Sequence, residues 1–319
     1  MCKNNFENDL FFILLAYMFC SLFILVSYYY ALNFEFKGDT QEYFYAFNKI
    51  ISNPFPWGRE FVTSCIMWLI HSIGGDFRFF LFICLLMWSP VVFYLAFSAK
   101  KNVFLFFACL FFLLPLFMGN VLFLIRQFNA ALFFLIFVYY YNKKNSKLIS
   151  LLFIILSIGS HISAVMWFIF FNKKVKLYCT KPIVIFSITF ISFLIFAMQV
   201  DVLSMLVNSF VELSNVLGVT EVERKLLFYI SNESMDAASV RYPFIVLSFI
   251  VAFLSIFLLV KSKTDNSLFL LALIQSLLLL TLSHNVVAAN RFGFFAFYFC
   301  IPLVLILFSF CFKKNRVKF

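Results

Sequence analysis

The sequence has few charged residues, and it lacks the motifs of the common nucleotide- and metal-dependent enzymes. Only 12% of its 319 residues are charged, whereas 64% are hydrophobic and 52 are Phe. It contains no P-loop, no GxSxG or HExxH pattern and no Cys/His spacing typical of a metal site. We therefore expect neither a nucleotide nor any other cofactor, and no transition metal.

Neither the cysteines nor the net charge indicates a specific partner. The eight cysteines form no CxxC pair, so we interpret them as small hydrophobic side chains. The net charge is +11, but the lysines cluster beside apolar runs. This is the pattern of cytoplasmic loops in membrane proteins, and it argues against nucleic acid as a partner.

Several apolar runs reach the roughly 20 residues that a helix needs to cross a bilayer. The expected fold class is an all-α polytopic membrane protein, with residues 1–319 as a single transmembrane helical bundle. If every lysine cluster is cytoplasmic, an even number of crossings separates successive clusters. About ten transmembrane helices satisfy this condition, two of them short, with both termini inside.

Two parts of this scheme involve a choice. The runs 102–118 and 121–141 are expected to hinge at Gly119-Asn120. The stretch 148–171 is either one span or two short helices meeting at His161, and the parity of crossings favours the pair. Breaks inside a membrane are tolerated where they line a polar cavity. The other expected spans are 10–31, 77–98, 182–200, 242–260, 267–283 and 291–311.

Two segments, about 32–76 and 201–240, are expected to be external, and they hold most of the acidic residues. The stretches 40–51 and 60–74 in the first segment are typical of helices lying on the membrane surface. Most arginines also fall at the outer face. Arginine suits phosphate because its planar guanidinium donates two parallel hydrogen bonds.

Arg126 lies inside an apolar run, together with Gln127 and Asn129. A charge at the bilayer centre costs at least about 2.5 kcal/mol. Arg126 therefore either pairs with a carboxylate from another helix or faces a charged substrate. Because Arg241 and Arg291 lie at the edges of other apolar runs, we predict that the three arginines form one cationic cluster.

Four further residues are candidates for substrate contacts. His161 interrupts an apolar segment, either as a capping or packing residue or as a contact to phosphate or hydroxyl. Arg241 either extends to lipid headgroups or belongs to the cationic cluster. His284 and Asn290 bracket a short turn before Arg291, which indicates an anion or sugar contact.

Asp39 and Glu42 are three residues apart and share a face if this turn is helical. Asp39 or Thr40 either caps the surface helix, or Asp39 takes a proton from a sugar hydroxyl. A divalent cation held by the two carboxylates is also open. Tyr43, like Trp57, either anchors the membrane interface or offers an aromatic face to a sugar ring.

Short motifs of this chain match a known family at several places. They are LIRQFNAA at 124–131, YNKK at 141–144, LSIGSHISA at 156–164, Asp39 with Tyr43, and Arg291 with Tyr298. In these motifs, over 32–171 and 284–298, the sequence resembles the EpsG family of exopolysaccharide and O-antigen polymerases. Where that family has a Glu-Pro-Gly-Tyr-like motif, this chain has Trp57-Gly58-Arg59-Glu60-Phe61, so the resemblance gives Glu60 no role.

The resemblance implies a Wzy-like polymerase, related to the GT-C-type membrane glycosyltransferases. It would join oligosaccharide repeat units carried on undecaprenyl diphosphate, at the periplasmic face of the bacterial inner membrane, in O-antigen (lipopolysaccharide) or exopolysaccharide synthesis. The expected partners are this lipid-linked oligosaccharide, membrane lipid and a chain-length regulator protein.

The resemblance also suggests roles for the candidates. The substrate diphosphate would be bound by Arg126, Arg241, Arg291 and His161. Asp39, with Glu42, would act on the acceptor hydroxyl. Sugar and other polar contacts would come from Gln127, Asn129, His284, Asn290 and Tyr43. No metal is needed if arginines neutralise the diphosphate.

Other functions remain open at this point. An O-antigen ligase or a lipid-linked monosaccharide transferase would use the same kind of substrate. A flippase or transporter belongs to a different class, whose members usually carry inverted repeats and charges near the midplane, and this sequence shows neither. A membrane O-acyltransferase would need a His/Asp pair, which His161 keeps open.

Overall fold

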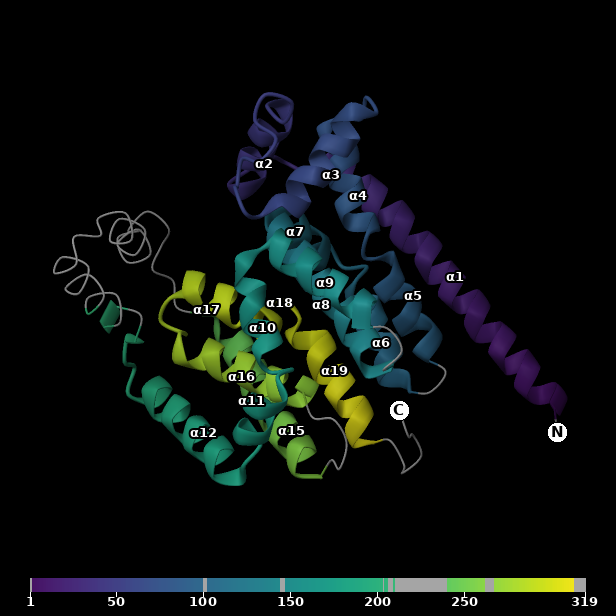
Figure 1. Ribbon diagram of the computed structural model, residues 1–319. Helices are drawn as coiled ribbons and strands as arrows, with labels where there is room; N and C mark the ends of the chain where they lie inside the picture. The colour runs from purple at the N-terminus through teal and green to yellow at the C-terminus, as the bar shows by residue number, and fades with distance from the viewer. Residues whose placement is uncertain are drawn as a thin grey trace. The chain divides into compact units, whose positions relative to one another are not determined.

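The computed structural model describes residues 2–99, 102–143, 147–202, 204–205, 209, 240–261 and 267–312. All regular elements in these ranges are helices, as the sequence predicts (Figure 1). The chain forms two compact units. Unit 1 is Met1–Ile169 with Phe312–Phe319, and unit 2 is Phe170–Cys311.

The longest helix of unit 1, α1 (Cys2–Asn33), packs along α4 (Phe77–Leu86) and α5 (Ser89–Ser98). The helix α4 begins where the Asp76 carboxylate accepts a hydrogen bond from the Phe79 amide. The expected helices 10–31 and 77–98 are confirmed, because α1 from Leu10 onward and the continuous pair α4–α5 are long and apolar enough to cross a membrane.

The expected hinge at Gly119-Asn120 is wrong. Both residues lie inside α7 (Pro115–Phe123), which follows α6 (Val103–Phe111) at an angle of 53°. The break occurs before Pro115 because proline has no N–H to continue the ladder of α6. A second break at Leu124, with non-helical φ and ψ of −121° and 48°, precedes α8 (Ile125–Lys143).

The stretch around His161 is broken, as the sequence predicts. The helix α9 (Lys147–Ser160) ends there, and the 3₁₀ turn η2 (Ile162–Ala164) leads into the short α10 (Val165–Ile169). His161 itself is extended, with φ −157° and ψ 128°.

The stretches 40–51 and 60–74 are helical, as α2 (Asp39–Asn48) and α3 (Phe61–Ser72), and their position on a membrane surface stays a prediction. The helix α3 packs against α8 and α9. Gly159 makes this contact close, because a Cβ there would lie 2.6 Å from the Phe61 ring. The packing of α3 on α9 therefore brings the start of α3 next to the break at His161.

In unit 2, the long apolar helix α15 (Tyr242–Lys261) packs between α16 (Ser267–Thr281) and α19 (Cys300–Cys311) over a core rich in leucine and valine. The expected single span 291–311 is wrong, because three helices replace it. Gly293 lies so close to α16 that a Cβ would be 2.8 Å from Leu279, and the buried Gln275 amide oxygen accepts a hydrogen bond from the Phe295 amide. The helices are α11 (Lys173–Cys179), α12 (Pro182–Ala197), α15 (Tyr242–Lys261), α16 (Ser267–Thr281), α17 (Val286–Phe292), α18 (Phe294–Tyr298) and α19 (Cys300–Cys311).

Among the described residues, three helices are long and apolar enough to cross a membrane: Leu10–Asn33, Phe77–Ser98 and Tyr242–Lys261. The number is five if the bent pairs α6–α7 and α11–α12 each form one span. The count of about ten spans and the sidedness of the loops therefore stay predictions. Most of the second expected external segment, 201–240, lies outside the described residues.

Candidate functional site

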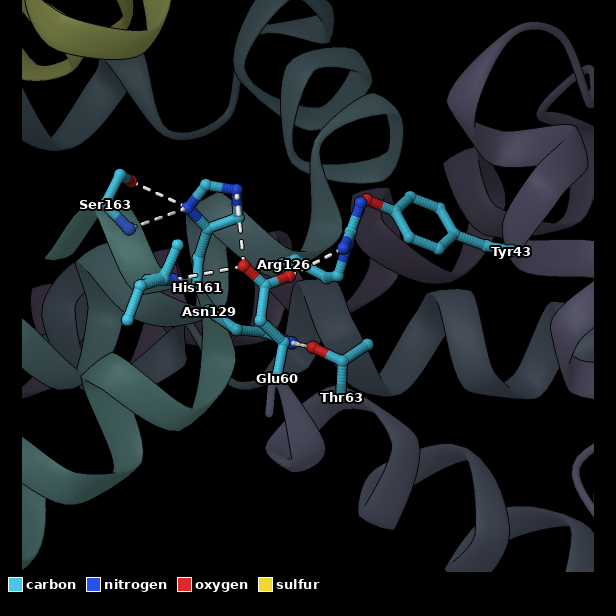
Figure 2. A network of polar contacts seen from close by, with 8 residues as sticks. Tyr43, Glu60, Thr63, Arg126, Asn129, His161 and Ser163 are labelled. Carbon is cyan, nitrogen blue, oxygen red and sulfur yellow. Dashed lines mark hydrogen bonds and ion pairs between the residues drawn. The ribbon is translucent and has the colours of Figure 1, made fainter. Parts of the chain in front are cut away.

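A cluster of polar side chains in unit 1 joins four segments that are distant in sequence (Figure 2). Tyr43 comes from α2, Glu60 directly precedes α3, Arg126 lies in the first turn of α8, and His161 occupies the break after α9. We refer to these four residues as the Glu60 cluster, because Glu60 contacts two of the others.

The ion pair between Glu60 and Arg126 is short and largely buried. Arg126 Nη1 donates to Glu60 Oε2 at 2.6 Å, and the two side chains are only 23% and 12% exposed, respectively. The positive end of the α8 dipole favours the carboxylate and disfavours the arginine at this position. Arg126 therefore depends on Glu60, and the alternative that Arg126 pairs with a carboxylate is the one that the structure shows.

Aromatic rings fix the orientation of the Arg126 guanidinium. Its carbon lies 4.8 Å from the ring centroid of Trp57 and 5.8 Å from that of Tyr43, and Nε donates to the Tyr43 hydroxyl at 3.4 Å. Burial raises the pKa of the Tyr43 phenol, and the Arg126 charge only partly opposes this shift. Tyr43 therefore keeps its proton at neutral pH and accepts the hydrogen bond from Arg126.

The second carboxylate oxygen of Glu60 faces the break at His161. The Ile162 amide donates to Oε1 at 3.1 Å, and His161 Nε2 lies 3.8 Å from the same oxygen. On the other side of the ring, the Ser163 amide donates to His161 Nδ1 at 3.3 Å, and the Ser163 hydroxyl, which can donate as well as accept, lies 2.7 Å from the same nitrogen. Because Nδ1 accepts a hydrogen bond, the neutral ring carries its proton on Nε2, pointing toward Glu60.

Below the cluster, a buried hydrogen bond links α8 to α3. Asn129 Nδ2 donates to Thr63 Oγ1 at 3.3 Å, and both side chains are inaccessible to solvent. Gln127 is also buried, with 4% exposure. Sugar contacts were expected from Asn129 and Gln127, but both are packed inside unit 1 in this structure.

The acidic residues predicted to be catalytic lie beside the cluster. Asp39 is the first residue of α2 and is half-buried, close enough to Tyr43 for its charge to act on the phenol. No side chain caps α2, and the Thr40 hydroxyl donates instead to the Leu122 carbonyl, so the capping interpretation is wrong. Glu42 is exposed. In the described part of the chain, no group of three His, Cys, Asp or Glu residues is arranged to hold a metal ion.

The remaining candidates belong to unit 2. The Val240 amide donates to the Ser283 carbonyl at 2.8 Å, which brings the segments of Arg241 and His284 together. Arg241 is exposed at the start of α15, and His284 Nε2 is buried with no hydrogen-bond partner among the described residues. Asn290 and Arg291 are half-buried in α17. Arg126 belongs to unit 1, so a single cluster of three arginines stays a prediction.

These features define a class of protein, a helical membrane protein with a buried, internally paired polar cluster. The family model of the EpsG family matches residues 16–319. The chain therefore belongs to the EpsG family, a Wzy-like polymerase family, which confirms the resemblance seen in the motifs. No curated protein and no solved structure matches the chain significantly.

Glu60 is the residue that the sequence analysis missed. It stands where the family has its Glu-containing motif, but the flanking residues differ, and a single Glu next to an exposed Arg59 resembles a surface charge. The available signal was the cost of Arg126 in an apolar run, which requires a carboxylate nearby. Sequence alone could not say which of several acids supplies it.

Proposed function

We propose that this protein polymerises oligosaccharide repeat units carried on undecaprenyl diphosphate, at the outer face of the bacterial inner membrane. Its family and apolar helices already support a membrane polysaccharide polymerase-like role. The observation that carries the finer proposal is the Glu60 cluster, because it places titratable groups and an oriented guanidinium together in an otherwise apolar chain.

The reaction needs two kinds of groups. An acceptor hydroxyl loses its proton and forms a bond to the anomeric carbon of the donor sugar. The bond from that carbon to the diphosphate oxygen breaks, and the lipid diphosphate leaves with the electron pair. Oriented cations and hydrogen-bond donors stabilise the charge that develops on the leaving group.

The ion pair between Arg126 and Glu60 affects the roles that we propose for the candidate residues. Because Arg126 is paired with Glu60, the pair carries no net charge, so it cannot neutralise a diphosphate by itself. In the proposal, Arg126, Arg291 and His161 donate hydrogen bonds to the substrate diphosphate, while the exposed Arg241 supplies positive charge. Asp39, with Glu42, remains the sequence-based candidate for the base, and His284 and Asn290 for sugar contacts, whereas Tyr43 is as buried as Gln127.

The proposal is tested by deleting the gene in its own polysaccharide-producing host and separating the polysaccharide on a gel. A polymerase deletion leaves single repeat units on lipid or core, and the wild-type gene restores the ladder. Arg126→Ala should not restore it, whereas Arg59→Ala, which removes an exposed neighbouring charge, should.

Other phenotypes would contradict the proposal in distinct ways. Full-length chains that stay unattached would indicate a ligase. Repeat units trapped inside the cell would indicate a flippase. A change in decoration alone would indicate an acyltransferase.

A further inference from the structure

Glu60 Oε1 and His161 Nε2 face each other across a narrow gap that no direct hydrogen bond closes, so a ligand oxygen would contact both atoms from one side of the gap. Glu60 Oε1 and His161 Nε2 are 3.8 Å apart, which is beyond the length of a direct hydrogen bond. An oxygen placed about 2.8 Å from both atoms would make a normal hydrogen bond to each. A carboxylate has about four acceptor positions, and the two bonds from Arg126 and Ile162 leave acceptor capacity for this contact.

The two sides of the gap differ in hydrogen-bonding character. Oε1 of Glu60 is an acceptor, whereas Nε2 of His161 carries a proton because the Ser163 amide donates to Nδ1. A hydroxyl group donates one hydrogen bond and accepts others, so it satisfies both sides at once. An anion would be repelled by Glu60, and a cation would meet the proton on Nε2.

The surroundings of the gap suit a sugar. Ile162, at the rim, is 56% exposed, so the gap is close to the surface of unit 1. Trp57 and Tyr43 lie on the other side of Arg126, with ring centroids 5.3 Å apart. Tyr43 is buried behind Trp57, whereas Trp57 is partly exposed and offers an apolar face beside the polar groups, a combination that matches a pyranose ring with its hydroxyls.

We infer that Glu60 and His161 bind the acceptor sugar hydroxyl, and that Glu60 is the general base that takes its proton. This inference rests on the proposed function and names a further catalytic pair for it. The hydroxyl donates to Glu60 Oε1 and accepts from His161 Nε2. As the oxygen bonds to the anomeric carbon, its proton passes to Glu60 and the lipid diphosphate leaves with the electron pair. In this inference Glu60 replaces Asp39 as the base, and His161 contacts the acceptor hydroxyl rather than the diphosphate. Arg126 is then a positioning residue for Glu60.

The test uses the full-length protein in liposomes with a purified undecaprenyl-diphosphate-linked repeat unit. Glu60→Gln keeps the size of the side chain and an acceptor for the Ile162 amide, but it cannot take a proton. We expect kcat to fall by about 10²–10⁴-fold, with KM changed by less than about threefold. Glu35→Gln is the matched control, because this carboxylate is exposed and lies outside the cluster.

Two substitutions of His161 test the bridging geometry without removing the carboxylate. In His161→Gln the amide nitrogen takes the place of Nε2, whereas in His161→Asn it takes the place of Nδ1. We expect His161→Gln to keep kcat within about tenfold of wild type and His161→Asn to lose about 100-fold, with equal thermal unfolding midpoints in detergent. A merely structural role as the cap of η2 predicts the reverse order, because Asn is a good helix cap and Gln is not.

The outcomes separate this inference from the proposed function. Wild-type polymerisation together with a near-normal kcat in Glu60→Gln overturns the inference alone. The same holds if His161→Gln and His161→Asn lose activity equally, or if Asp39→Asn abolishes turnover while Glu60→Gln does not. Absence of polymerisation by the wild type, with intact substrate binding, overturns the proposed function itself.

Discussion

Arg126 in unit 1 and Arg241 in unit 2 lie in different environments. In unit 1, Arg126 is buried, paired with Glu60 and flanked by aromatic rings. In unit 2, Arg241 is exposed at the start of α15 and forms no ion pair with any described residue. The comparison shows that an arginine in an apolar run is not by itself a free cation for substrate. Its role depends on whether the fold supplies a counter-charge.

Replacing each arginine by alanine should separate the two environments most clearly. Arg126→Ala leaves the Glu60 carboxylate largely buried without its cation, which costs about 3–5 kcal/mol. Arg241→Ala should leave the free energy of unfolding nearly unchanged, because the side chain is exposed. Thermal or denaturant unfolding of both variants in the same detergent measures the difference. Equal losses would show that the two sites are alike.

The close approach of α9 to α3 should be sensitive to a single methyl group. In Gly159→Ala, the new Cβ would lie 2.6 Å from the Phe61 ring, so the helices must separate, at a cost of about 1–3 kcal/mol. Gly119→Ala is the control, since a Cβ there meets only the Tyr30 hydroxyl at 3.2 Å. Unfolding midpoints provide the measurement, and polymerisation assays should show a loss in Gly159→Ala alone. An unchanged Gly159→Ala would disprove close packing at this point.

The hydrogen bond below the cluster should have a smaller effect. Thr63→Val keeps the shape of the side chain but removes the acceptor of Asn129 Nδ2. A buried donor without its partner costs about 1–3 kcal/mol, and we expect the lower part of this range because the bond is long. Asn129→Ala combined with Thr63→Val measures the coupling between the two residues. Strict additivity of the two changes would mean that the contact contributes nothing.

The smallest effect is expected in unit 2, at the cap of α17. The Asn285 side chain accepts a hydrogen bond from the Ala288 amide at 2.9 Å. Asn285→Ala should therefore reduce the free energy of unfolding by about 1 kcal/mol, whereas Asn285→Asp should retain the cap. If Asn285→Ala lowers activity more than stability, α17 positions Arg291 for the substrate. If neither the activity nor the free energy of unfolding changes, unit 2 tolerates the loss of the Asn285 cap of α17.

The long apolar helices can be predicted from sequence, because local composition decides their structure. The apolar stretches that became α1, the pair α4–α5 and α15 are recognisable from their length alone. The break at His161 was also predictable, because Gly, Ser and His interrupt an apolar run there. The breaks at Pro115, Leu124 and Gly293 were missed or misplaced. Leu124 carries no breaking signal of its own, and Gly293 acts through its contact with α16.

Some residues of the candidate site can likewise be predicted from sequence, whereas others cannot. Arg126, His161 and Tyr43 were identified as polar or aromatic residues in unusual places, and the structure brings all three together. Glu60 was given no role, although it holds the cluster together. Arg241 and His284 lie in neighbouring segments of unit 2, but their relation to Arg126 stays a prediction.

The amino-acid sequence by itself determined that this protein is helical, apolar and a member of the EpsG family, because composition and short motifs are local properties of the chain. Only the tertiary structure decided which carboxylate neutralises Arg126 and which proton His161 presents. Those choices depend on the packing of α3, α8 and α9, which brings residues about 66 and 100 positions apart within hydrogen-bonding distance of Glu60.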